Sequence, residues 1–471
     1  MDAARRPAPA TLPAFRFEFG ATLALAWPLV LGNLAQIAIT TTDVVMMGRL
    51  GSEALAAGAL GANLYTAVQI FATGLVAAAA PLMAAEIGRR RHAVREVRRT
   101  VRQAMWSAVG IAILAWIALW HAEAILRLLG QDPALAEDAG RYVRALQWSL
   151  LPLLGFTILR TFVAVLGRPI WGLLAGLVAV AVNAAANWTL MFGHFGLPRL
   201  ELVGAGLAST LSCVVMFAGL ALVVRLDRRF RRYRLFGRFW RADWPRLARL
   251  WAVGLPIAVT MTLEVAVFNA AVFLMGLIGA ATVAAHSIAI QIASVSFMVP
   301  LGIGQAATIR VGVAYGRGDR EAIARAGWSA FVLGVGFMGI MALFMISVPR
   351  FLIGLFLDLG APDNVEVVAL AVSFLGIAAL FQVADGAQAV AAGMLRGLQD
   401  TRIPMLIAAF GYWGAGFGLA LLLGFGLDLG GRGIWIGLAA ALVTVAVLML
   451  ARWLMRERLG LTRLRPEARP G

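Results

Sequence analysis

Residues 28–57 read PLVLGNLAQIAITTTDVVMMGRLGSEALAA, and residues 256–285 read PIAVTMTLEVAVFNAAVFLMGLIGAATVAA. At a constant offset of 228 residues the two stretches align without a gap, and the alignment continues to residues 90 and 318. Its identical pairs include Pro28/Pro256, Met47/Met275, Gly48/Gly276, Gly51/Gly279, Ala57/Ala285, Gly74/Gly302, Gly88/Gly316 and Arg89/Arg317. The chain therefore contains an internal repeat, and its two halves are expected to share one fold.

Long apolar stretches occur throughout the 471 residues, of which 61% are hydrophobic, and the mean hydropathy is +0.85. Soluble domains contain roughly 45–50% apolar residues, whereas a helix that crosses a bilayer needs about 20 in a row. The sequence predicts an all-α polytopic membrane protein with twelve transmembrane helices. The predicted spans are residues 21–47, 55–86, 101–120, 141–166, 170–193, 202–225, 250–277, 283–313, 326–348, 366–396, 403–425 and 433–455.

The arginines between these spans predict the orientation of the chain. With the N-terminus inside, the inside loops and termini hold 33 of the 41 arginines, the outside loops hold 7, and Arg160 lies within a span. Basic residues concentrate in the cytoplasmic loops of membrane proteins. We therefore expect both termini to be cytoplasmic, the protein to lie in a bacterial inner membrane, and the basic loops to contact lipid headgroups.

Six predicted spans in each half mean that both halves enter the membrane in the same orientation. The repeat axis then runs along the membrane normal, as in secondary transporters whose two bundles rock about a central site. We assign residues 1–225 to an N-terminal lobe, 226–249 to an Arg-rich cytoplasmic linker and 250–471 to a C-terminal lobe. The expected architecture is two pseudo-symmetric six-helix bundles in a chain that acts as a monomer.

Three acids, Asp43, Glu264 and Asp385, lie within predicted spans. A charge at the bilayer centre costs about 2.5–3.5 kcal/mol, so such residues mark functional sites by default. In the repeat Glu264 stands where Gln36 stands, and Asp385 corresponds to Arg160, which makes the two lobes chemically different. A carboxylate in a low-dielectric environment can hold a monovalent cation, accept a proton or attract a cationic substrate. The three acids are the candidate coupling residues.

Two amides accompany the first acid. Asn183 and Asn187 are one helical turn apart in the fifth span and share a face. Amides in apolar helices form hydrogen bonds between helices, and they also complete cation-binding networks. The sequence leaves both roles open for this pair, and the sharper hypothesis places both residues in a cation network with Asp43.

Substrate contacts are predicted from side chains that suit flat organic cations, namely aromatic rings and neighbouring polar groups. We select Asp43 and Gln36, which lies two turns before it on the same face, together with Gln291, Phe297 and Phe381. Most aromatic residues in such a chain serve packing or anchor it at the interface, and this alternative stays open for each ring.

Several classes of function are excluded by missing residues. The chain has no lysine, which excludes a P-loop ATPase and Schiff-base chemistry. Its single cysteine, Cys213, cannot form a disulfide within the chain, and the four histidines lack metal-ligand spacing. No catalytic motif is present, so we expect neither an enzyme nor a cofactor. The arginines lie in short loops between spans, so we expect no nucleic-acid partner.

Three segments resemble the multidrug and toxic compound extrusion (MATE) family, in its NorM-like branch. They are PLVLGNLAQIAITTTDVVMMGRLGSEALAA (28–57), the run from LPIAVTMTLEVAVF (255–268) to VAAHSIAIQIASVSFMVPLGIGQAATIRVG (283–312), and ALFQVADGAQAVAAGMLRGLQDTRIP (379–404). With the repeat, the resemblance covers nearly the whole chain.

The resemblance implies drug export driven by inward Na⁺ or H⁺. By motif position it implies that Glu264 and Asp385 are the cation-site acids of the C-terminal lobe and that Asp43 is the acid of the N-terminal lobe. It also implies that Asn183 and Asn187 are polar partners of Asp43. One departure bears on the ion, because sodium-coupled members carry a Tyr where this chain has Phe381.

Two other functions remain in competition. A flippase for a lipid-linked glycan would need a cationic cavity to hold a diphosphate, whereas here only Arg160 is clearly intramembrane among the arginines and three acids are present. A membrane-embedded enzyme or a passive scaffold has no motif in its favour. The leading hypothesis is a cation-coupled antiporter for organic cations.

Overall fold

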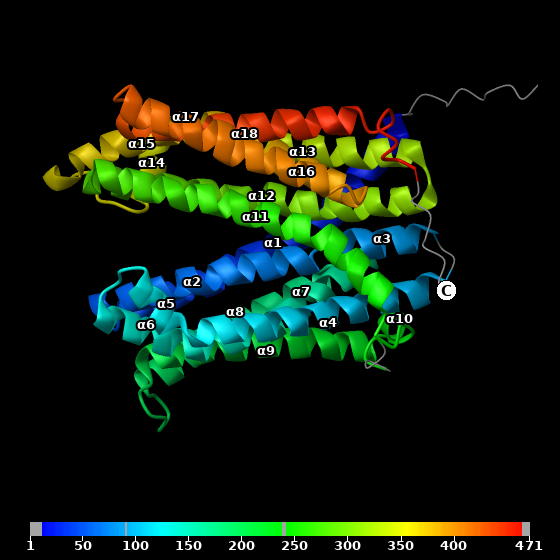
Figure 1. Ribbon diagram of the computed structural model, residues 1–471, viewed down its shortest axis with the longest axis horizontal. Coiled ribbons are helices and arrows are strands. Elements are labelled where there is room, and N and C mark those ends of the chain that lie inside the picture. The colour runs from blue at the N-terminus through cyan, green and yellow to red at the C-terminus, as the bar shows by residue number, and fades with distance from the viewer. Residues whose placement is uncertain (1–11, 90–91, 238–241, 464–471) are drawn as a thin grey trace, which may run out of the picture.

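The computed structural model describes residues 12–89, 92–237 and 242–463, and every regular element within these ranges is helical (Figure 1). Twelve helical segments of the described residues are long and apolar enough to cross a membrane. Six of them precede the connection between the halves and six follow it. Figure 1 shows them as two bundles side by side, the N-terminal half in blue to green and the C-terminal half in green to red. The predicted all-helical, twelve-span fold is confirmed.

The first bundle is formed by α1 (Leu12–Gly48), α2 (Ser52–Val76), α3 (Ala79–Arg89), α4 (Ala93–Trp120), α5 (Ala122–Leu128), α6 (Pro133–Leu146), the 3-10 turn η1 (Gln147–Ser149), α7 (Leu150–Val165), α8 (Ile170–Phe192) and α9 (Glu201–Leu226). The short helix α10 (Arg228–Arg231) follows. Two spans are composite, because α2 continues into α3 and α6 continues through η1 into α7. In α3 the first turn holds Pro81, whose missing N–H suits the start of a helix.

The second bundle is formed by α11 (Trp244–Ile278), α12 (Ala280–Arg317), α13 (Arg320–Ser347), α14 (Pro349–Gly354), η2 (Pro362–Asn364), α15 (Val365–Gly397), α16 (Arg402–Ala409), η3 (Phe410–Phe417), α17 (Gly418–Leu421), η4 (Leu422–Gly426) and α18 (Gly430–Leu454). Both η3 and η4 are π-helical. They lie in a glycine-rich eleventh span, and π-helical turns within α-helices are frequent at functional sites.

Helix ends differ from the predicted spans where the chain leaves the apolar layer. The seventh span begins earlier than predicted, since α11 starts at Trp244, inside the stretch 226–249 assigned to the linker. Asp243 caps it by accepting from the Arg246 backbone N–H at 3.4 Å, and Pro245 lies in its first turn. Hydrophobicity reports only the part of a helix inside the bilayer, so polar extensions of this kind are missed.

The turn between the first and second helices of each half depends on glycine. Gly51 and Gly279, a repeat-related pair, precede α2 and α12 with φ of 122° and 157°. These values favour a residue without a Cβ. Each turn reverses the chain between the first and second helices of its half, and so places α1 against α2 and α11 against α12.

The two lobes meet along a seam that obeys the repeat symmetry. A Cβ added at Gly302 of α12 would lie 2.5 Å from Cγ2 of Val30 on α1, and one added at Gly74 of α2 would lie 2.5 Å from Cα of Ala258 on α11. Val30 and Ala258 are repeat equivalents, and so are Gly74 and Gly302. The backbones therefore approach closely at two related points along the seam helices, where glycine is required by space.

The seam continues toward the end of the molecule at which the two described chain ends lie (Figure 1). Gly88 of α3 and Gly316 of α12, again repeat equivalents, leave no room for a Cβ beside the backbone of the opposite lobe. An ion pair crosses the seam nearby, since Arg310 donates to both carboxylate oxygens of Glu18, at 2.8 and 2.7 Å. The lobes are thus closed against each other at the terminal end.

Candidate functional site

The acid of the N-terminal lobe is held by donors from two other helices. Asp43 on α1 accepts from the Nδ2 atoms of Asn183, at 3.0 Å, and Asn187, at 2.6 Å, both on α8. It also accepts from Ser209 Oγ of α9 at 2.5 Å, and only 8% of the residue is exposed. One carboxylate therefore has three hydrogen-bond donors, a pattern that favours negative charge where no counter-ion is present.

The structure brings together the three residues of the predicted N-lobe network and adds a fourth that the sequence did not reveal. Asn187 also donates to Asn183 Oδ1 at 3.2 Å, which orders the two amides along α8. Ser209 was missed because a serine in an apolar helix usually bonds to its own backbone. Ser212, one turn later, does so by donating to Ala208 O at 2.7 Å. Only the tertiary structure shows that Ser209 donates to Asp43 whereas Ser212 bonds within its own helix.

The acids of the C-terminal lobe share a single amide. Gln388 Nε2 donates to Glu264 Oε1 at 3.0 Å and to Asp385 Oδ1 at 3.3 Å, so it bridges α11 and α15. Its own Oε1 accepts from the Tyr412 hydroxyl, on the π-helical stretch η3, at 3.2 Å. Asp385 is 6% exposed and Glu264 is half-buried. Two carboxylates of the predicted coupling set are therefore adjacent, and Gln388 and Tyr412 complete the cluster.

One cation lies within electrostatic range of this pair. Arg396 is eleven residues after Asp385 on α15, hence on the same helical face, and it interacts electrostatically with Glu264. Ionised, the cluster would contain two negative charges and one positive charge. It therefore retains a net charge of −1, which one monovalent cation or one proton would neutralise.

The repeat counterpart of the C-lobe site lacks this arrangement. Arg160 of α7 donates to Asn33 Oδ1 at 3.2 Å, and its guanidinium lies 6.0 Å from the Phe156 ring centroid. No carboxylate of the described residues pairs with Arg160. Arg160 thus ties α7 to α1.

The predicted substrate residues occupy different environments. Gln291 on α12 is exposed, while Gln36 and Phe297 are half-buried. Phe381 is 2% exposed and stacks on Trp435 of α18 with ring centroids 5.5 Å apart. Its ring packs inside the C-terminal lobe, so we assign Phe381 to packing and leave it out of the proposed substrate site.

Four exposed polar residues form a symmetric set in the half of the seam helices that lies away from the described chain ends. Thr41 and Asn269 are repeat equivalents, as are Asn63 and Gln291, and all four are exposed. Each lies eleven residues from one of the seam contacts, Val30, Ala258, Gly74 and Gly302, on the same helix. Eleven residues are close to three turns, so each polar side chain points toward the opposite lobe. Their exposure indicates that the lobes diverge there.

Comparison with known sequences assigns the family. The MatE family matches residues 28–189 and 256–422, and both matches start at the repeat-related prolines. The chain belongs to the MATE transporter family. This match confirms the resemblance found from the sequence. Members of the family couple transport to ions and are not enzymes.

Curated relatives match the MATE chain over almost its whole length. "Probable multidrug resistance protein NorM" of Mesorhizobium japonicum is 59% identical over 94% of this chain and 95% of its own length. The protein of the same name from Brucella suis is 56% identical over 93% of both chains. "Multidrug resistance protein NorM" of Burkholderia vietnamiensis is 41% identical over 92% of this chain and 93% of its own.

Solved MATE structures share the fold at low sequence identity. A eukaryotic MATE transporter superposes with a TM-score of 0.85 at 21% identity, covering 95% of this chain and 98% of that one. A Vibrio cholerae MATE transporter gives 0.85 at 16% identity, covering 95% and 99%. The two-bundle architecture is therefore that of the family.

Proposed function

We propose that this MATE transporter exports organic cations from a bacterial cytoplasm in exchange for Na⁺ or H⁺. The observation that carries the proposal is the C-lobe cluster, in which Glu264 and Asp385 share the one amide of Gln388. Two carboxylates this close repel each other when both are ionised, and a bound cation or proton relieves the repulsion. The cluster is therefore suited to bind and release one coupling cation.

Asp43 has the complementary role in the proposal. Its three donors favour the ionised form, and an ionised Asp43 would attract a cationic substrate. Thr41, Asn63, Asn269 and Gln291 would line the substrate path between the lobes, with Gln36 and Phe297 deeper along it. Substrate and coupling cation then favour different arrangements of the lobes, which is the condition for exchange.

The proposal includes an orientation. The arginine asymmetry supports cytoplasmic termini and a location in the inner membrane. The lobes are closed at the terminal end, so the described state would be open toward the outside. The acids lie within the two bundles, and the residues of the proposed path face each other across the seam of the same chain. A single chain therefore contains the complete site, and we propose a monomer.

The test uses purified protein in liposomes loaded with a fluorescent organic cation. A pH gradient and a Na⁺ gradient are imposed separately on wild type, Asp43→Asn and Asp385→Asn, with Asp363→Asn as a matched control. Asp363 is an exposed acid of η2, outside the cluster. We expect one gradient to drive exchange in wild type and in the control, and neither acid variant to respond.

Movement of the dye under neither gradient would contradict the antiport of organic cations. Transport of a lipid-linked glycan by the same liposomes would then favour the flippase alternative. Gradient-driven exchange that is unchanged in Asp385→Asn would leave the activity standing and remove the assigned coupling site.

A further inference from the structure

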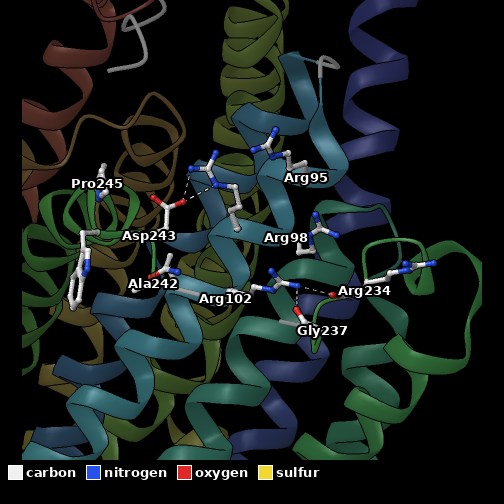
Figure 2. A pocket seen from close by; sticks show the side chains of 11 residues that line it. Arg95, Arg98, Arg102, Arg234, Gly237, Ala242, Asp243 and Pro245 are labelled. Atoms are coloured by element: carbon white, nitrogen blue, oxygen red, sulfur yellow. Dashed lines mark hydrogen bonds and ion pairs between the residues drawn. The ribbon is translucent and has the colours of Figure 1, made fainter. Parts of the chain in front are cut away.

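A second, strongly basic site lies at the terminal end of the molecule, outside the acidic sites. It is a pocket of about 700 Å³ between α4, the segment after α10 and the start of α11. Five of its lining residues are arginines, Arg95, Arg98, Arg99, Arg102 and Arg234, and its acid is Asp243 (Figure 2). Its volume is within the range of small-molecule sites, roughly 300–1,000 Å³.

One arginine builds the wall of this basic pocket. Arg102 of α4 donates through Nε to Leu235 O at 3.1 Å and through a terminal nitrogen to Arg234 O at 3.3 Å. It also donates to Gly237 O, as Figure 2 shows. These bonds fasten the segment after α10 to α4, so the pocket is formed by ordered backbone on both sides.

The acids near the pocket form ion pairs with Arg99 and Arg246. Arg99 binds Asp243, with Nε 2.7 Å from Oδ2, and it also binds Glu96. Arg246 binds Glu86 and Glu96 across the seam. Two arginines thus pair with three carboxylates, which leaves one negative charge beside the remaining arginines of the pocket.

Three arginines of the pocket are left for a ligand. Within residues 12–89, 92–237 and 242–463, no carboxylate pairs with Arg95, Arg98 or Arg234. The Nε of Arg98 is buried and has no hydrogen-bond partner. Figure 2 shows Arg98 beside the Arg102 contact and the side chain of Arg234 directed away from Arg98. An oxyanion bound at Arg98 would accept from its Nε and neutralise part of the positive charge of these arginines.

Tryptophans place the pocket at the level of the lipid headgroups. Trp244 lines it and is 68% exposed, while Trp106 and Trp251, further along α4 and α11, are 36% and 37% exposed. Exposed tryptophans concentrate at membrane–water interfaces. Basic pockets at this depth between transmembrane helices bind anionic headgroups. We propose that this pocket binds the phosphodiester headgroup of an anionic phospholipid. The proposal does not depend on the transported substrate or the coupling ion.

The consequence for the transporter follows from the pocket's walls. The headgroup would contact α4 of the N-terminal lobe and the segment that leads into α11 of the C-terminal lobe. A bound lipid would thus brace the seam at its closed end and stabilise the described arrangement of the lobes.

The test compares lipid binding by the full chain and two triple variants, measured by native mass spectrometry and by thermal melting in detergent. The pocket variant is Arg95→Gln, Arg98→Gln and Arg234→Gln. The matched control is Arg228→Gln, Arg229→Gln and Arg231→Gln on α10, which removes the same charge from the same end outside the pocket. The probes are phosphatidylglycerol, phosphatidylcholine and inorganic phosphate.

We expect phosphatidylglycerol to bind and to raise the melting temperature of wild type and control, with at least tenfold weaker binding by the pocket variant. The single variant Arg98→Gln should lose about threefold and guards against misfolding of the triple variant. Equal losses in the pocket and control variants would overturn the site. Binding of phosphatidylcholine equal to that of phosphatidylglycerol would overturn the anionic headgroup, and binding of inorganic phosphate without phosphatidylglycerol would assign the pocket to a soluble phosphate.

Discussion

The two lobes share a fold but differ in how many hydrogen-bond donors they supply to each buried carboxylate. In the N-terminal lobe one carboxylate, Asp43, receives three donors from two helices. In the C-terminal lobe two carboxylates, Glu264 and Asp385, divide the donors of one amide. The first arrangement gives three neutral donors to one carboxylate, whereas the second gives one amide and the nearby Arg396 to two. The repeat thus provides one scaffold, and different residues at equivalent positions give its halves different chemistry.

The largest effect is expected from removing the charge at the centre of the C-lobe pair. Asp385→Asn eliminates the repulsion that makes the pair bind a cation, so gradient-driven exchange should fall to background. Dye flux in liposomes measures it, with Asp363→Asn as the control. Residual exchange above one tenth of the wild-type rate would mean that Glu264 alone is sufficient for coupling.

A second experiment moves an acid between the lobes. Gln36 and Glu264 are repeat equivalents, so the double variant Gln36→Glu and Glu264→Gln exchanges their chemistry. We expect at least a tenfold loss of ion affinity that the added acid does not restore, because Arg160 stands in the N-terminal lobe where Asp385 stands in the other. Ion titration of the purified protein checks this. Recovery to wild-type affinity would show that the lobes are interchangeable.

A third experiment removes the bridging amide. Gln388→Met deprives both carboxylates of their shared donor, and hydrogen bonds to charged groups contribute about 1.5–3 kcal/mol. The ionised pair becomes less stable, so the coupling cation should bind about tenfold more tightly, and exchange should slow because release is slower. Weaker cation binding in this variant would instead identify Gln388 as a ligand of the ion.

The smallest effect is expected in the N-terminal lobe, where the donors are redundant. Ser209→Ala removes one of three donors to Asp43 and should lower the stability of the fold by about 1–2 kcal/mol without abolishing exchange. Ser212→Ala is the matched control, since that hydroxyl bonds only within its own helix. Thermal melting in detergent compares them. Equal melting temperatures would show that Ser209 adds nothing to the Asp43 site.

The fold was predictable from the sequence because its signals are long. Apolar length, arginine asymmetry and a gap-free repeat each extend over many residues, so an error at one position changes little. The failures lie where polar contacts extend a helix or reshape it. Hydrophobicity placed the start of α11 too late because it does not register the cap at Asp243, and it gave no sign of the π-helical turns in the eleventh span.

The site was predictable only in part. The three acids could be found because a charge in an apolar span is conspicuous. The sequence predicts Asn183 and Asn187 as partners of Asp43, but it does not predict Ser209 and Gln388 as partners of the acids, because they belong to residue types that mostly serve packing in such helices. Phe381 illustrates the reverse error, since an aromatic ring beside an acid can face either a substrate path or the lobe interior, and only its stacking on Trp435 decides.

The central claim is that the coupling cation binds in the C-terminal lobe and not at Asp43. The direct measurement is the number of cations, H⁺ or Na⁺, bound per purified protein near neutral pH, in wild type, Asp43→Asn and Asp385→Asn. We expect one cation in wild type, one in Asp43→Asn and none in Asp385→Asn. Loss of the cation in Asp43→Asn, or its retention in Asp385→Asn, would contradict it.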